Sequence, residues 1–109
     1  MIHIIHNGIL YQVNSKNGEY KELTSGWTGT TYMTQDNDHL YIICQETIYK
    51  VKKTDGTYTE LCGGYGSVTG LTLVNDDLFC IESGTLYKIN KDTGAYDSLG
   101  GWNGSCVCV

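Results

Sequence analysis

The stretch that decides the fold is residues 46–83, ETIYKVKKTDGTYTELCGGYGSVTGLTLVNDDLFCIES, because its layout recurs on both sides with a period of 38 residues. Four sets of equivalent residues mark this period: Tyr11, Tyr49 and Tyr87; Gly18, Gly56 and Gly94; Tyr20, Tyr58 and Tyr96; and Leu23, Leu61 and Leu99. A repeat of this length is typical of stacked supersecondary units rather than of one irregular domain.

Each unit contains four predicted strands. The apolar runs at 2–5, 40–44 and 78–81 are too short for helices and do not alternate, which suits strands covered on both faces. Segment 9–14 alternates like a half-buried strand. After a glycine turn, the polar segments 19–23, 57–61 and 95–99 suit an outer edge strand. The Thr, Ser and Gly-rich segments 28–34 and 66–73 predict an inner strand near a crowded axis.

Four short antiparallel strands in about 38 residues have the size of a β-propeller blade. The composition also favours an all-β fold, since the chain has no proline, fourteen glycines and nine tyrosines. We therefore predict a single β-propeller domain with three four-stranded blades. Blade one is 1–24 completed by 103–109, blade two is 25–62 and blade three is 63–99.

Three blades are too few for a closed propeller, because propellers have four to eight. Left open, the apolar segments 2–6 and 106–109 would be bare sheet edges that promote aggregation. Two copies joined head to tail, each lending its last strand to the first blade of the other, leave no open edge. We predict a homodimeric six-bladed propeller; the alternative is that the chain is a fragment of a longer propeller.

Charge and composition argue against several classes of protein. The net charge is −5 and arginine is absent, so a phosphate backbone would be repelled and nucleic acid is not an expected partner. The chain has no apolar run of membrane-spanning length and no basic, apolar leader, so we expect no membrane insertion and no signal peptide. We expect a cytoplasmic protein or one released by a non-classical route. Its five cysteines occupy different slots of the repeat, which favours reduced thiols.

The order of motifs resembles the blade of the tachylectin family of β-propeller lectins. The order is a glycine and aromatic corner, a small-residue strand, Leu-Tyr-x-Ile and then Leu-Tyr-Lys. The matching residues are Gly26-Trp27 with 40–42 and 48–50, Gly63-Gly64-Tyr65 with 78–79 and 86–88, and Gly100-Gly101-Trp102. The chain departs from the family in its shorter outer hairpins and in Tyr65, where a tryptophan is expected. The resemblance implies a propeller that binds sugars, N-acetylated hexosamines among them.

A second likeness is to quinoprotein-like repeats and lies at 84–94, GTLYKINKDTG. It implies the same fold and no particular ligand.

The corners at Trp27, Tyr65 and Trp102 are the candidate sugar sites. An aromatic face stacks on the C–H face of a pyranose, and nearby amides and hydroxyls fix its hydroxyl groups. In a propeller these corners lie near the turns at 7–8, 45–46 and 83–84. The expected ligand-binding residues are Gly26, Trp27, Thr28, Gly64, Tyr65, Gly66, Gly101, Trp102, Asn103, Asn7, Gln45 and Ser83.

The alternative for these aromatic residues is packing between blades. We expect packing for the tyrosines at 11, 49 and 87, and favour it for those at 20, 58 and 96, which alternate with charged residues. The corner residues are open to either role.

We expect no metal site, no cofactor and no catalytic site. His3 and His6 point to opposite faces of a strand, and the Asn and Asp clusters at 36–38 and 75–77 lack the spacing of a calcium loop. No nucleophile, base and orienting group cluster in the sequence. Two functional hypotheses follow: a multivalent lectin that binds glycans, and a non-enzymatic propeller that serves as a scaffold for protein partners.

Overall fold

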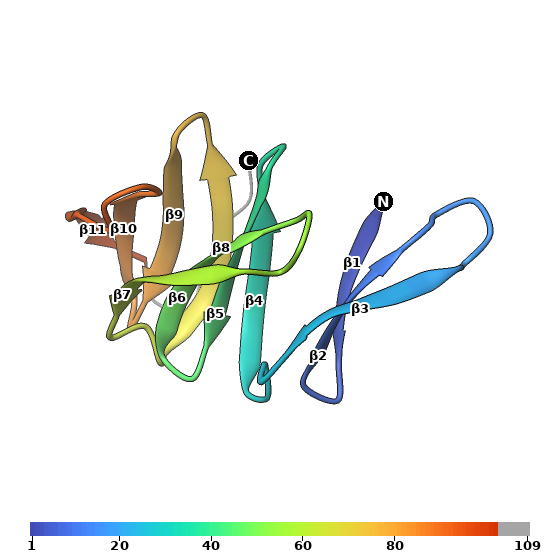
Figure 1. Cartoon of the computed structure of the whole chain (residues 1–109). Coiled ribbons are helices and arrows are strands. Elements are labelled where there is room, and N and C mark those ends of the chain that lie inside the picture. The colour runs from blue at the N-terminus through green and yellow to red at the C-terminus, as the bar shows by residue number, and fades with distance from the viewer. Residues whose placement is uncertain (103–109) are drawn as a thin grey trace.

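The computed structural model describes residues 1–102, and within them the protein consists of eleven β-strands without a helix (Figure 1). Every strand pairs antiparallel with the next strand in its sheet. The strands are β1 (Ile2–His6), β2 (Ile9–Val13), β3 (Tyr20–Ser25), β4 (Thr30–Gln35), β5 (His39–Cys44), β6 (Thr47–Lys52), β7 (Tyr58–Gly63), β8 (Val68–Val74), β9 (Asp77–Glu82), β10 (Thr85–Asn90) and β11 (Tyr96–Gly101).

The strands form three sheets in chain order, β1-β2-β3, β4-β5-β6-β7 and β8-β9-β10-β11. The second sheet lies between the other two, so the first and third sheets are at opposite ends of the molecule (Figure 1). The predicted all-β fold and the two four-stranded units are confirmed. The first sheet has three strands in the described part of the chain, and the segment predicted to complete it, 103–109, lies outside the described residues.

The hairpin between the two central strands of each unit has a two-residue turn with positive φ at both positions. The φ values are 51° and 77° at Asn7 and Gly8, 47° and 73° at Gln45 and Glu46, and 49° and 79° at Ser83 and Gly84. This conformation matches the twist of antiparallel strands. It aims the carbonyl of the second turn residue towards the corner that follows the outer strand.

The outer hairpins carry a β-bulge at the same place in each sheet. Pairing shifts between Leu10 and Tyr11 in the first sheet, and at the equivalent residues of the other two. The extra residue on the outer strand is Leu23, Leu61 or Leu99. Because a bulge redirects a side chain, this leucine leaves the polar pattern of the strand. A Cβ on Gly56, in the turn of the second sheet, would lie 3.0 Å from Leu23 Cβ, so that turn is in close contact with the bulge.

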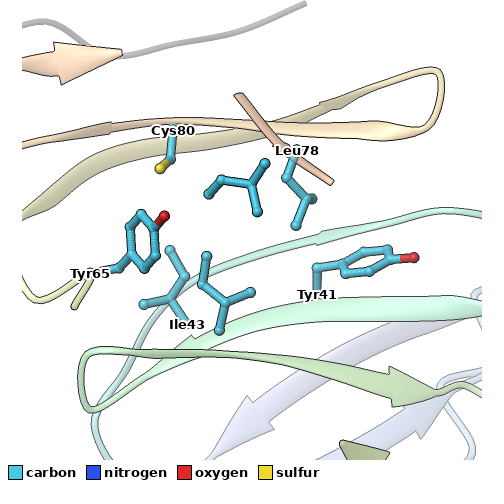
Figure 2. Packing of buried hydrophobic residues seen from close by; sticks show 7 residues of the cluster. Tyr41, Ile43, Tyr65, Leu78 and Cys80 are labelled. Carbon is cyan, nitrogen blue, oxygen red and sulfur yellow. The ribbon is translucent and has the colours of Figure 1, made fainter. Parts of the chain in front are cut away.

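Two hydrophobic clusters hold the three sheets together, and β5 contributes to both. Its residues Leu40, Ile42 and Cys44 pack with the first sheet around Leu10 and Trp27. Tyr41 and Ile43 point the other way and pack with Leu78 and Cys80 of the third sheet, with Tyr65 closing the cluster (Figure 2). The apolar run 40–44 is therefore covered on both faces, as predicted. Alternate side chains of β5 point to opposite faces, so they pack against different neighbouring sheets.

A polar contact ties the second sheet to the third beside this core. Asp36 accepts hydrogen bonds from Lys91 Nζ at 2.9 Å, from the Tyr41 hydroxyl at 2.9 Å and from the backbone N–H of His39 at 2.7 Å. Partial burial by itself raises the pKa of Asp36. The hydrogen bonds, that of Lys91 first, outweigh it and hold the pKa well below its ordinary value.

We expect Asp36→Asn to lower the free energy of unfolding by about 1 kcal/mol at pH 7, since it removes a charged acceptor. Because folding lowers the pKa of Asp36, its stabilisation is present above the unfolded value of 3.8 and is lost as the pH falls below it. Urea denaturation at pH 7, 4 and 3 measures both effects. Asp92→Asn, which removes an exposed ion pair with Lys50, is the control and should show a weaker dependence on pH. Equal pH dependence of wild type and Asp36→Asn would contradict the assignment.

Candidate functional site

Each glycine and aromatic corner folds back onto the hairpin turn of its own sheet. The backbone N–H of Trp27 donates to the Gly8 carbonyl at 2.9 Å, and that of Tyr65 donates to the Glu46 carbonyl at 2.8 Å. Trp102 makes the same bond to Gly84 at 2.5 Å. This confirms that the corners lie beside the turns at 7–8, 45–46 and 83–84. The third corner is one residue shorter and still reaches the equivalent carbonyl.

Trp27 and Tyr65 are packed between sheets. Their exposed fractions are 3% and 6%. The indole N–H of Trp27 donates to the Thr24 hydroxyl at 2.8 Å, and its ring meets Tyr49 and Tyr58 edge to face at 5.4 and 5.3 Å. Neither ring offers an open face, which corrects the expectation of an aromatic platform at these two corners. The next sheet covers each ring, so the packing alternative describes both.

Trp102 is different, with 55% of its surface exposed. It follows the outer strand β11 of the third sheet, and no further sheet lies beside it within residues 1–102. Its predicted neighbour Asn103 lies outside the described residues.

Two pockets open at equivalent places, one beside each buried corner. Their volumes are about 130 Å³ and 230 Å³. The first is lined by Ser25, Gly26, Trp27, Cys44, Gln45, Tyr49 and Tyr58. The second is lined by Gly63, Gly64, Tyr65, Glu82, Tyr87 and Tyr96. All six residues of the second pocket stand 38 positions after a residue of the first, so the repeat has produced the same pocket twice.

Aromatic walls and polar rims give both pockets the same general chemistry. The outer tyrosines Tyr58 and Tyr96 are exposed, whereas the corner rings are buried. Gln45 is oriented by a hydrogen bond from its Nε2 to the Thr28 carbonyl at 3.0 Å. Glu82, in the second pocket, accepts a bond from the Ser67 backbone N–H at 2.9 Å. Such a site can stack on an apolar ring face and hydrogen-bond to its hydroxyl groups.

The structure brings five of the expected site residues into these pockets: Gly26, Trp27 and Gln45 in one, Gly64 and Tyr65 in the other. Others expected with them are exposed but do not line either pocket, namely Asn7, Thr28, Gly66, Ser83, Gly101 and Trp102. Sequence reasoning missed the tyrosines at 49, 58, 87 and 96 as pocket residues. Their recurrence was visible, but it was attributed to packing alone.

The described cysteines have the chemistry of buried thiols. Cys44, Cys62 and Cys80 are free. Burial raises the pKa of Cys62 to about 11 and that of Cys80 to about 12, so both thiols are protonated at neutral pH and are poor nucleophiles.

Across residues 1–102, histidine, cysteine, aspartate and glutamate side chains form no group of three or more that could hold a metal ion. The same part of the chain has no helix long and apolar enough to cross a membrane.

Comparison with known proteins supports the fold and no particular ligand. No protein-family model and no curated protein matches the chain. The extracellular domain of the one-component system BT4673 from B. thetaiotaomicron is similar in structure, with a TM-score of 0.63 and 15% identity over 90% of this chain. The N-terminal domain of Nup159, a propeller, has a TM-score of 0.59 and 13% identity over 93% of this chain.

The chain spans 16% and 30% of the length of these two solved chains. At such identities the likeness concerns the fold alone. It is consistent with an arrangement of the three sheets as propeller blades.

We expect Trp27→Ala to lower the free energy of unfolding by about 3 kcal/mol or more, because it empties a large volume between two sheets. Trp27→Tyr is the matched control, since Tyr65 fills the equivalent position of the next blade; it should lose less than half as much. Chemical denaturation followed by circular dichroism measures both. A loss below about 1 kcal/mol for Trp27→Ala would show that the ring is not a packing element.

Proposed function

We propose that the protein is a non-enzymatic, multivalent carbohydrate-binding propeller. The observation that carries this proposal is the pair of equivalent pockets, each with an aromatic wall and a polar rim. Their small volumes suit one sugar ring each rather than a drug-sized ligand. Single-ring sites bind weakly, and repetition on one molecule converts weak binding into useful avidity. The resemblance of the repeat to tachylectin blades supports N-acetylated hexosamines as ligands.

The stacking surface in this proposal is supplied by the outer tyrosines. Trp27 and Tyr65 support the pocket from behind, while Tyr58 and Tyr96 keep exposed ring area at its mouth. T-shaped contacts hold these rings in place, at 5.6 Å from Tyr49 to Tyr58 and 5.7 Å from Tyr87 to Tyr96. A ring already fixed by its neighbour loses little conformational freedom when a ligand binds.

A glycan array and erythrocyte agglutination test the proposal. We expect Tyr58→Ala together with Tyr96→Ala to weaken binding about tenfold per site, since a stacking contact contributes about 1 to 1.5 kcal/mol. Tyr32→Ala is the control, because Tyr32 is an exposed tyrosine that lines neither pocket. Silence of the wild type on a broad array would contradict the lectin and favour a scaffold for protein partners.

We further propose that two copies close into a six-bladed ring. Rings of this chain contain multiples of three blades, and six is the multiple within the usual range of four to eight. A pocket of about 350 Å³ supports the shared strand. It lies between Ile2 and His3 of β1 and Met33, Thr34 and Gln35 of β4. This is where an inner strand of the first sheet would lie, because the inner strands β4 and β8 of the other sheets are in contact.

His3 adds a second reason to expect a strand in that slot. Both of its ring nitrogens are covered and have no hydrogen-bond partner. Unpaired polar atoms of this kind are costly, and a neighbouring backbone would supply partners.

Sedimentation equilibrium at micromolar concentration tests the ring. We expect twice the chain mass. A mass of three or more chains would correspond to nine or more blades and would correct the blade count. The mass of a single chain would contradict closure by self-association.

A further inference from the structure

The packing contact between neighbouring sheets occurs twice inside the chain. At each end of the molecule, one surface corresponds to half of this contact and has no partner sheet within residues 1–102. Inside the chain, the back of one sheet and its corner pack on the front of the next sheet. Within residues 1–102 no sheet covers the front of the first sheet, and Ile2, Ile4 and Tyr20 are exposed there. At the back of the third sheet, 50% of Leu99 and 55% of Trp102 are exposed.

The register of the repeat assigns Trp102 to a cleft on the first sheet. Trp27 packs against Tyr49 and Tyr58, and the residues 38 positions before these tyrosines are Tyr11 and Tyr20. Those two rings already hold the T-shaped arrangement, 5.5 Å apart. With Ile4, His6 and Val13 they line a pocket of about 410 Å³, larger than the two pockets whose corners are filled.

A second contact of the repeat, between a glycine turn and a leucine, supports the same pairing of the two ends. The turn at Gly56 lies against Leu23, and the turn at Gly94 lies against Leu61 and Cys62. The equivalent turn at Gly18 has nothing within 4 Å of an added Cβ, and the equivalent leucine is the exposed Leu99. Gly18 lies at the same end of the molecule as Tyr11, and Leu99 lies at the same end as Trp102.

The chain cannot make this contact with itself. The first sheet and β11 lie on opposite sides of the second sheet (Figure 1), and the molecule is 42 Å long. Trp102 therefore reaches such a cleft only on a second molecule. A second copy of this chain presents the required leucine and corner, Leu99 and Trp102, in the required order.

We propose that Trp102 of one copy packs into the cleft formed by Tyr11 and Tyr20 of the next copy, and that this junction builds a third ligand pocket from residues of both copies. The ligand role of the junction rests on the proposed function. The third pocket has His6 where the first two have Cys44 and Glu82. It is incomplete in a single copy, because its corner comes from the partner.

Tryptophan fluorescence tests the contact without any ligand. The chain has two tryptophans, so Trp27→Tyr leaves Trp102 as the reporter. As the concentration rises through the association range, we expect its emission to shift to shorter wavelength and its quenching by acrylamide to fall severalfold. A Trp102 that stays fully quenchable in the assembled protein would overturn the contact.

Two variants test the contact by mass. Trp102→Ala should weaken self-association by about 30-fold, the size typical of an interface anchor. Gly18→Asn should also weaken it, because asparagine tolerates positive φ but its side chain would meet Leu99 of the next copy. Both positions are open in the single chain, so circular dichroism melts below the association range should match wild type. Tyr96→Ala, whose tyrosine lies at the pocket beside Tyr65 and away from both junction surfaces, is the control for self-association. Unchanged association in both junction variants would overturn the proposal.

Native mass spectrometry with N-acetylglucosamine tests the third pocket. We expect up to three sugars per chain for the assembled wild type and two for Trp102→Ala. Two per chain in both would overturn the ligand role of the junction. No sugar on any protein would contradict the proposed function and the third pocket together, while the Trp102 fluorescence would still decide the contact between copies.

Discussion

The structure depends on the packing of the apolar back of one sheet against the apolar front of the next. β5 shows why this contact is demanding, since Leu40 and Ile42 serve one neighbour and Tyr41 and Ile43 the other. Fully burying one such side chain is worth about 1.5 to 3 kcal/mol, so a few of them account for the order of a whole domain's stability. An isolated four-stranded sheet would expose most of this surface. The stack, rather than the single blade, is the stable unit.

Much of this arrangement could be predicted from the sequence because the period exposes it. Positions 38 residues apart located the strands, the turns and the order of the sheets, and the run 40–44 identified a strand buried on two sides. The bulge at Leu23 could not be seen, because it depends on how two strands pair. The period showed that this leucine and its equivalents recur, but it did not indicate which residues they contact. In the structure, Leu23 lies against the turn at Gly56 of the next sheet, and Leu61 and Cys62 lie against the turn at Gly94.

The candidate site was harder to predict for a related reason. Whether Trp27 is a ligand platform or a packing residue depends on the sheet that follows it in the chain. Neither the residue type nor its position in the repeat contains that information. Trp102 has the same motif and is exposed because no sheet follows it in the described part of the chain. For the tyrosines at 58 and 96, packing was predicted and the structure shows partly exposed rings. Their charged neighbours suggested an outer packing role, whereas they combine contact with exposure at the mouth of a pocket.

The two-faced stacking of the sheets has a consequence for how the molecule forms. Each sheet is a meander of neighbouring strands, so its pairing closes short loops and should be fast. In the proposed assembly, joining two copies would be a second-order step that slows on dilution. Before that step the folded chain would carry the two complementary ends of the proposal, and ends of this kind close into a ring or extend into an open polymer. The angle between neighbouring sheets, where Trp27 and Tyr65 are packed, would then determine the balance between rings and filaments.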